Sequence, residues 1–448
     1  MMRPMPTNIP SPAPPSFYQL LQMDAHGLWA RIHSAASGRE KARLAFAMAI
    51  RSLLLVTFAI LFIGILTALF GNENSGLVVA GFCILLGIKH VPFGYRSADS
   101  LVALAAVLLA MVAGGIASLS DSLAVCILAN FALTALILVL VANDPPMGNA
   151  GIYMFGYLFV SQTPVTGTAL ASRFALAGLL WVICGAVLVH KHHGKFSKVR
   201  LHHLVQGFCL GSSTTLWQLR LAAGITGALL LGQLLGLPRN VWVGYACMSV
   251  LLPYTPDIEP ESSKSSDPKV VQTHATSPTG TEPPTADAKP PTSAPQAAGM
   301  EAPSEGAPSD SRTPESTAPK GTSSESTTSE STPKPSRNKA ALRRGAQRIG
   351  GVVIGSVLFN VAAVIVPPQW RVLFGPAAGI CIGFSNKYMV NNALNCFGAL
   401  LLAEGVYGLA GSAVLRIWDN LIGVAFAIAF TLLLGYLEEH VPRRSANS

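Results

Sequence analysis

The sequence predicts an all-α membrane protein, a polytopic bundle of about twelve transmembrane helices built as two parallel six-helix repeats. Two observations of composition favour this fold: 50% of the 448 residues are hydrophobic and 12% are charged, whereas soluble domains average about 25% charged residues. The third observation is a series of apolar runs of about 20 residues, the length that crosses a bilayer as a helix. This composition excludes a soluble enzyme and a soluble nucleic-acid-binding protein.

Twelve apolar segments are candidate spans, and they divide into two sets of six. The first set comprises 45–70, 75–92, 101–118, 122–142, 150–167 and 172–190, and the second comprises 217–236, 240–255, 348–366, 370–385, 392–409 and 414–436. Four of them, at 75–92, 150–167, 240–255 and 370–385, are short or broken by Gly or Pro. We expect these four to be tilted, buried or re-entrant, because irregular backbone is tolerated in a membrane only where protein covers it.

Positive charge predicts the orientation of these spans. Lys and Arg gather in the N-terminal segment 1–44, in the loop 191–216, at the end of the insert 256–340 and in the tail 437–448. With twelve spans these stretches all lie on one side, and the positive-inside rule makes that side cytoplasmic. Apolar residues also recur at helical spacing over 17–33. They predict either an interfacial helix on the cytoplasmic leaflet or a short helix packed on the protein.

The insert 256–340 differs from the rest of the chain in composition. It holds 15 of the 31 prolines and no aromatic residue, with 12 acids and 8 bases. Such a segment cannot bury enough apolar surface to offset its chain entropy, so we expect a disordered cytoplasmic loop between the eighth and ninth spans. The remaining residues hold 10 acids and 23 bases. The basic excess therefore belongs to the flanks of membrane spans, and we expect no nucleic-acid partner.

The two transmembrane halves, 45–190 and 217–255 with 341–436, have similar layouts. Arg51 and Arg220 lie in the first span of each half, and Arg173 and Arg416 lie at the start of the last. Six spans per half give both halves the same orientation, which is a parallel repeat of the kind common in transporters. Substrate sites in such proteins lie at the interface between the halves.

Three segments in order resemble the fusaric acid resistance and aromatic acid exporter family. They are a short span after a Pro-containing turn, Val241–Pro253; the pattern R-x-x-G-x-x-x-G within Arg344–Gly355; and the pattern R-x-x-D-x-x-x-G at Arg416–Gly423. The resemblance covers the second half well and the first half loosely. Larger members of the family carry folded cytoplasmic domains, in place of which this sequence has only the insert and the loop 191–216.

The resemblance implies a function and partners. Members of this family are inner-membrane efflux proteins of bacteria that export aromatic carboxylic acids and related toxic organic anions. They commonly work beside a periplasmic membrane-fusion adaptor, and sometimes with an outer-membrane channel. For this chain the resemblance therefore implies an organic-anion substrate and a multi-pass location in the inner membrane.

Two acids within the predicted spans, Glu404 and Asp419, are the first candidate site residues, because a charge in the bilayer is expensive and usually functional. Arg416 and Asp419 are three residues apart and share a helix face. They are either an ion pair that pins the last helix, or a pair in which Arg416 binds a substrate carboxylate and Asp419 binds a proton. Glu404 is either a lone proton-coupling carboxylate or a hydrogen-bonded acid near the periplasmic boundary.

Arg173, Lys387 and Asn391 complete the candidate substrate site. Arg173 begins the sixth span much as Arg416 begins the twelfth, and Lys387 and Asn391 lie in a polar break between two spans. The simpler interpretation of the break is a cytoplasmic loop that obeys the positive-inside rule. The histidines at 190–203 have no Cys or acid beside them, so we expect no metal site there.

No P-loop, nucleophile elbow or H-E-x-x-H pattern is present, so we expect neither an enzyme nor a cofactor. The leading hypothesis is a proton-coupled secondary exporter of organic acids. A passive organic-anion channel and a non-transporting membrane scaffold are the alternatives. Substrate identity, coupling ion, the need for an adaptor and assembly as a homo-oligomer stay open at this point.

Overall fold

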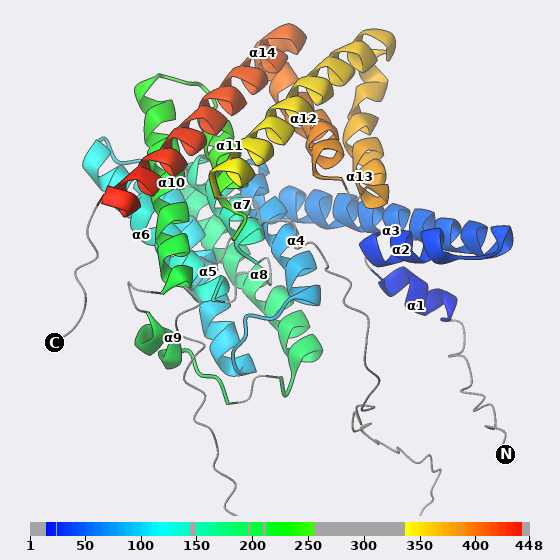
Figure 1. The fold of residues 1–448 in the computed structure, drawn as a ribbon, viewed down its shortest axis with the longest axis horizontal. Coiled ribbons are helices and arrows are strands. Elements are labelled where there is room, and N and C mark those ends of the chain that lie inside the picture. The colour runs from blue at the N-terminus through cyan, green and yellow to red at the C-terminus, as the bar shows by residue number, and fades with distance from the viewer. Residues whose placement is uncertain are drawn as a thin grey trace, which may run out of the picture. The chain divides into compact units, whose positions relative to one another are not determined.

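The computed structural model describes residues 15–440 apart from 24, 144–148, 196–197, 209–211, 255–336 and 386. These residues form helices and no strand, which confirms the predicted all-α class (Figure 1). The elements are α1 Phe17–Gln22, α2 Ala25–Ser34, α3 Gly38–Phe70, η1 Asn72–Asn74, α4 Ser75–His90, α5 Ser97–Ala117, α6 Leu123–Val141, α7 Ala150–Ser161, α8 Gly167–His192, α9 His202–Gly207, α10 Ser213–Leu234, α11 Val241–Leu251, α12 Arg337–Ile365, η4 Pro368–Leu373, α13 Phe374–Phe384 and α14 Tyr388–His440.

Within the described residues, six helices are long and apolar enough to cross a membrane: α3, α5, α6, α8, α12 and α14. The last one is broken at Gly408, whose φ of 70° is not helical, so its two parts correspond to the predicted spans 392–409 and 414–436. The four segments expected to be short form α4, α7, α11 and α13, of 16, 12, 11 and 11 residues. Eleven residues rise about 16 Å, roughly half of the hydrocarbon core. Short helices of this kind depend on neighbouring protein, and α11 is almost entirely buried.

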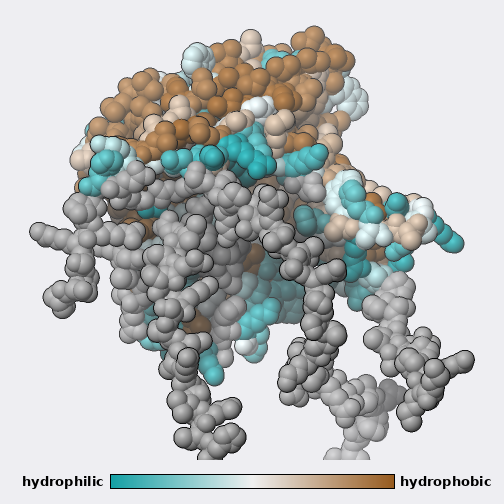
Figure 2. Space-filling view, viewed as in Figure 1, coloured by the Kyte–Doolittle hydropathy of each residue, from teal (hydrophilic) through white to brown (hydrophobic). Residues whose placement is uncertain are grey.

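Hydrophobic side chains also cover the outside of the bundle. Only 6% of the most apolar window of α3 is buried, and Leu54, Phe58 and Leu61 are among its exposed side chains. Figure 2 shows a similar hydrophobic surface over α12 and α14, bordered by hydrophilic residues near the end where α12 begins. An apolar exterior of this extent fits lipid rather than water. The chain is therefore a multi-pass membrane protein.

The contacts between helices are reciprocal. In one contact between the halves, α3, the first helix of the first half, packs on α13, the fourth helix of the second half. In the other, α10, the first helix of the second half, packs on α6, the fourth helix of the first half. Within the halves, α4 packs on α7 as α11 packs on α14, and α5 packs on α8 as α12 packs on α14. Two copies of one six-helix unit related by a twofold axis give this pattern.

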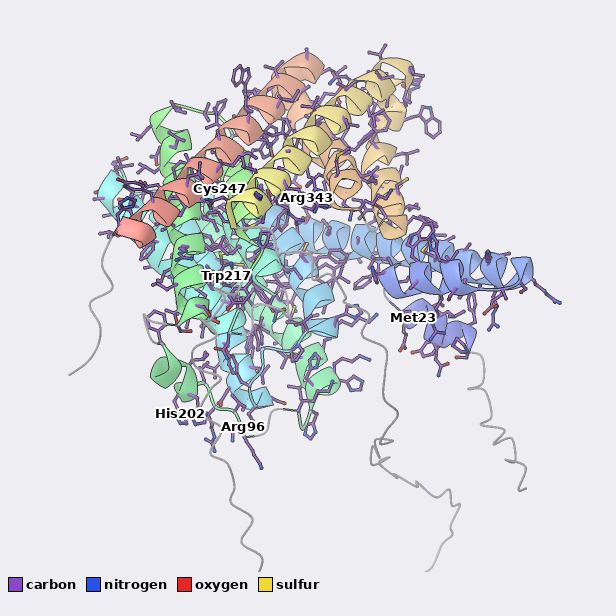
Figure 3. The ribbon with its side chains drawn as sticks, viewed as in Figure 1. Met23, Arg96, His202, Trp217, Cys247 and Arg343 are labelled. Atoms are coloured by element: carbon purple, nitrogen blue, oxygen red, sulfur yellow. The ribbon has the colours of Figure 1, made fainter. Side chains whose placement is uncertain are left out.

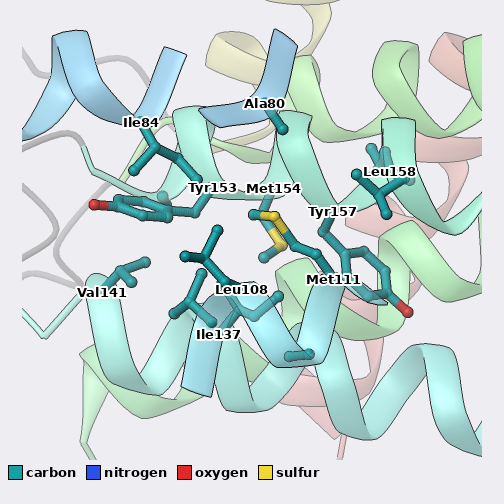
Figure 4. Packing of buried hydrophobic residues seen from close by; sticks show 14 of the residues in the cluster. Ala80, Ile84, Leu108, Met111, Ile137, Val141, Tyr153, Met154, Tyr157 and Leu158 are labelled. Carbon is teal, nitrogen blue, oxygen red and sulfur yellow. The ribbon is translucent and has the colours of Figure 1, made fainter. Parts of the chain in front are cut away.

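The largest core is built mainly from α4 to α8 of the first half and extends to α10 and α11 of the second. Tyr153 and Tyr157 of α7 are fully buried there among Leu108, Met111 and Ile137 (Figure 4). The Tyr157 hydroxyl donates to Asn130 Oδ1 at 2.8 Å, so this buried polar group is satisfied. The first half is therefore a tightly packed unit.

The N-terminal helices α1 and α2 contact α3. Leu20 and Leu28 of α1 and α2 are buried against α3, and the Trp29 indole N–H donates to the Phe384 carbonyl at the end of α13. These helices are packed on the protein.

The predicted loop 256–340 lies outside the described residues except for its end. The helix α12 begins at Arg337, eleven residues before the predicted span at 348.

Candidate functional site

Three strongly charged side chains are buried among the described residues: Arg173, Arg416 and Asp419, exposed by 1%, 6% and 0%. The last two lie on the second part of α14, beside the buried amides Asn392 and Asn420. Buried charge is costly unless it is paired or used. The region where α11, α12 and α14 meet is therefore the candidate site.

Arg348 of α12 forms the centre of this site. Its Nε donates to Asn420 Oδ1 at 3.0 Å, and its Nη1 donates to Asn392 Oδ1 at 2.7 Å. Asn420 in turn donates from Nδ2 to the Arg416 carbonyl at 2.7 Å. Arg348 thus bridges the two parts of α14 through neutral amides. None of its described partners is an acid, so its charge is not neutralised by an ion pair.

Aromatic rings hold three further arginines. The Arg416 guanidinium carbon lies 4.6 Å from the centre of the Trp242 ring. Arg239 lies 5.5 Å from the same ring and 5.6 Å from the ring of Tyr407. These are cation–π distances, and they hold a guanidinium without neutralising its charge.

The fourth member of the set is Arg344, whose guanidinium carbon lies 3.3 Å from the centre of the Tyr388 ring. Arg344 and Arg348 are four residues apart, so they share a face of α12. Arg343 beside them is exposed (Figure 3). We call Arg239, Arg416, Arg348 and Arg344 the arginine series. Trp242, Asn420 and the face of α12 link each member to the next.

The arginine series extends through most of the thickness of a membrane. Arg239 contacts Tyr407, which lies next to Gly408, so it marks one end. Asp419 follows Gly408 by 11 residues, about 16 Å of helix, and Asn392 precedes it by 16 residues, about 24 Å. The hydrocarbon core is about 30 Å thick. The arginine series therefore places four cationic groups along this length of helix.

Asp419 is the single acid buried in the described part of the site. Neither of its carboxylate oxygens has a hydrogen-bond partner, and Arg416 Nε also has none. The ion pair, one of the two alternatives for Arg416 and Asp419, is therefore not formed among the described residues, although the two share a helix turn. The reason is that Arg416 is directed onto Trp242 instead. Asp419 is therefore a buried polar group without a hydrogen-bond donor.

Glu404 lies apart from this cluster and is not the lone carboxylate that the sequence suggested. It forms an ion pair with Arg371 of η4, and Arg371 also donates from Nη2 to the Ala363 carbonyl at 2.6 Å. Both side chains are 18% exposed. The pair joins the end of α12 to α14 four residues before Gly408. It agrees with the alternative of a partnered acid near the predicted periplasmic boundary.

Arg173 is also separate from the arginine series. It donates from Nε to Asn74 Oδ1 at 2.8 Å, from Nη1 to the Thr163 carbonyl at 2.7 Å and from Nη2 to the Glu73 carbonyl at 2.8 Å. Asn74 donates in turn to the Ala169 carbonyl. These bonds tie three chain segments of the first half together. Arg173, a predicted substrate-binding residue, is therefore hydrogen-bonded within the first half and shares no described partner with Arg416.

The polar break before α14 divides into an exposed and a buried part. Lys387 is exposed and Asn391 is half-buried, with an Oδ1 that has no hydrogen-bond partner in the described structure. Its neighbour Asn392 accepts the hydrogen bond from Arg348.

Three site residues were not predicted from the sequence: Arg348, Asn420 and Trp242. All three lie within the family-like segments, and the signal was their polar or aromatic character in otherwise apolar helices.

Glycines make the close packing of this site feasible. A Cβ on Gly355 or Gly351 of α12 would meet the backbone of Ala393 or Met389 in α14. A Cβ on Gly423 would meet the Val243 carbonyl of α11. The glycines of both family-like patterns therefore bring the helices into backbone contact. This agrees with the close approach that the sequence predicted at Gly423.

The fold and site define a multi-pass membrane protein with buried cationic groups, as in transporters. Residues 334–430 match the family described as fusaric acid resistance protein-like. The match includes α12, α13 and most of α14, with Arg344, Arg348, Arg416 and Asp419, and it confirms the resemblance for this part of the chain. Neither a curated protein nor a solved structure matches the chain. The family match and the membrane helices together support a membrane transporter.

Proposed function

We propose that this protein is a secondary transporter that exports organic anions, with aromatic carboxylic acids as cargo, across a bacterial inner membrane. The observation that carries the proposal is the arginine series, four linked cationic side chains between α11, α12 and α14. Guanidinium groups bind carboxylates through paired hydrogen bonds. The similarity to fusaric acid resistance proteins supports the same class of cargo.

The site has the groups needed to bind a planar acid. Arg416 has a buried Nε without a partner, so it can donate to a carboxylate without first giving up a hydrogen bond. Trp242 and Tyr407 offer aromatic faces beside the guanidinium groups. An aromatic ring stacks on such faces, which a small inorganic anion cannot do.

Asp419 supplies the proton-binding group in this proposal. Residues three apart on a helix have Cβ atoms about 5–6 Å apart. At about 6 Å and an effective dielectric constant of about 20, a unit charge contributes about 3 kcal/mol, or about a hundredfold in affinity. Protonation of Asp419 therefore changes how strongly Arg416 binds an anion. This coupling links proton movement to anion movement.

The proposal includes orientation and a partner. The basic stretches of the sequence support a location of both termini in the cytoplasm by the positive-inside rule. The Arg239 end of the arginine series then faces the periplasm, where a membrane-fusion adaptor would receive the exported anion. Deleting a neighbouring adaptor gene in the host tests this partner: resistance to aromatic acids falls if the adaptor is required.

Transport by purified protein in liposomes tests the function. We expect the wild type to move radiolabelled benzoate or fusaric acid in response to a pH gradient. Arg416→Gln should lower the rate at limiting substrate at least tenfold, because it removes a charged donor worth about 1.5–3 kcal/mol. Lys387→Gln is the matched control, since this cation is exposed and outside the series.

Asp419→Asn separates coupled transport from passive conduction. We expect this variant to insert normally and to move the anion without dependence on the pH gradient. A wild type that conducts the anion at a rate independent of the pH gradient would show a passive channel instead. A folded wild type that moves no organic anion would contradict transport and favour a scaffold.

A further inference from the structure

A groove lies between α3, α4 and α8 of the first half, and it shares no residue with the arginine series. Its volume is about 560 Å³, within the range of small-molecule sites, which is about 300–1,000 Å³. Its walls are mostly apolar, and they include Leu54 and Phe58 of α3, Leu85 of α4, Val187 of α8 and Leu21 of α1. We call it the α3–α4 groove.

Two cations line the same end of the α3–α4 groove, Arg51 from α3 and Lys89 from α4. The two helices are joined by the short η1 and pack on each other, so they run in opposite directions. The ring centres of Phe58 and Phe82 lie 5.8 Å apart across them. Arg51 precedes Phe58 by seven residues and Lys89 follows Phe82 by seven. Both cations are therefore about 10 Å of helix away from this contact, at a similar depth.

Neither cation has a partner in the part of the chain that the structure describes. Arg51 is half-buried and Lys89 is exposed, and no ion pair, hydrogen bond or ring contact involves either of them there. None of the described lining residues is acidic, and His90 is the other titratable group at this end. A guanidinium within an apolar span is costly without a counter-charge. An anionic group beside Arg51 and Lys89 would supply that charge.

The surroundings of the groove indicate that its occupant comes from the bilayer. Of the six long spans among the described residues, α3 is the least covered by protein, and its side chains Leu54 and Phe58 are exposed. The groove therefore opens onto lipid. Phe58 lies about 10 Å of helix beyond Arg51, within the depth of about 15 Å that one leaflet contributes to the hydrocarbon core.

We propose that the α3–α4 groove binds an anionic phospholipid of the predicted cytoplasmic leaflet. Arg51 and Lys89 hold the phosphate of its headgroup. One acyl chain runs along the apolar side chains of Leu54, Phe58 and Leu85. Basic pockets between transmembrane helices bind anionic headgroups in this way, and the positive-inside rule assigns this end to the cytoplasmic side. The proposal does not depend on what the protein transports.

Native mass spectrometry of the full-length protein tests this site. The protein is released from micelles that contain equal amounts of phosphatidylglycerol and phosphatidylcholine, and the lipid retained per chain is measured. We expect phosphatidylglycerol to be retained in preference to phosphatidylcholine. Arg51→Gln/Lys89→Gln should weaken its binding about 25-fold, since each cation near a headgroup contributes about fivefold.

Lys41→Gln/Lys195→Gln is the matched control for charge, because it removes two exposed cations that do not line the groove. This variant should bind phosphatidylglycerol as the wild type does. Equal losses in the two double variants would reduce the effect to net charge and overturn the site. Arg51→Lys/Lys89→Arg keeps both charges and should keep the lipid, and a loss of lipid here would contradict a role for charge.

Leu55→Trp tests the apolar part of the groove. It adds bulk at a lining position and should displace the acyl chain. Affinity for phosphatidylglycerol should then fall about tenfold or more, the loss of about two buried methylene groups. Leu53→Trp is the matched control, because it places the same side chain at an exposed position of α3 outside the groove. Equal binding by these two variants would leave only a headgroup contact and overturn the groove as the site.

Other occupants of the groove would give different results. Equal retention of phosphatidylcholine and phosphatidylglycerol would contradict the preference for an anionic lipid. When 2-naphthoate is added to the micelles, wild-type protein that retains it but no phosphatidylglycerol would identify a free aromatic anion as the occupant and overturn the proposal. All of these are binding measurements, so failure of the proposed transport function leaves them interpretable.

Discussion

Replacing Gly355 with alanine tests whether close helix contact builds the site. A Cβ at this position would lie 2.7 Å from Ala393 Cα and 2.9 Å from Ala393 C, and nearer still to the carbonyl oxygen. Carbon atoms pack best at about 3.5–4.0 Å, so α12 and α14 must separate by about 1 Å. Overpacking of this kind costs about 1–3 kcal/mol. The same shift would lengthen the bonds from Arg348 to Asn392 and Asn420.

Gly350→Ala provides the matched control on the same helix. Its nearest neighbour is the Met389 Sδ at 3.7 Å, which is an ordinary contact. Alanine also favours a helix over glycine by about 0.8–1.0 kcal/mol, and this gain is common to both variants. Their difference in free energy of unfolding, measured by titration with dodecyl sulfate in mixed micelles, therefore isolates the contact with α14. We expect Gly355→Ala to be less stable by about 1–3 kcal/mol and defective in transport. Equal stability of the two variants would refute the close packing.

Three further predictions follow from individual side chains. Arg173→Gln should lower the free energy of unfolding by about 3 kcal/mol or more, since it removes three bonds from a charged donor, while Lys387→Gln should change it by less than about 0.5 kcal/mol; equal effects in thermal unfolding would contradict the bracing role. Asp419→Asn should raise the free energy of unfolding by about 1–3 kcal/mol, because it removes a carboxylate without donors; an unchanged or lower free energy of unfolding would contradict this reasoning. Glu404→Gln should keep pH-dependent transport, since Glu404 is paired with Arg371; loss of that dependence would return the proton-coupling role to Glu404.

The fold class and most element positions were accessible from the sequence. Apolar runs of fixed length identify membrane helices directly, because the bilayer sets the length and demands internal hydrogen bonding. The short segments at 150–167 and 240–255 were predicted as irregular and form α7 and α11, of 12 and 11 residues. The helix α12 begins eleven residues before the predicted span at 348, and these first turns are basic and have no apolar signal in the sequence.

The site was predicted only in part. Arg416 and Asp419 stood out because charge within an apolar span is rare. The partners of these two side chains could not be predicted, because the choice between an ion pair and a cation–π contact depends on which side chain lies opposite. Trp242 is more than 170 positions away from Arg416, and no local spacing indicates that the two meet. The choice between the two alternatives for Glu404 could not be made from the sequence for the same reason, since Arg371 lies in a different element.

The sequence by itself determined that this chain is a helical membrane protein with two similar halves and a small set of intramembrane charges. Those properties follow from composition and periodicity, which act locally along the chain. The tertiary structure alone decided how the charges are used. In the tertiary structure Arg173 is hydrogen-bonded to neighbouring segments of the first half, and Glu404 is paired with Arg371. Asp419 has no donor and lies beside the arginine series. Hydrogen bonds and ring contacts act over a few ångströms, so only the packing of distant helices selects which charges gain an acidic partner and which do not.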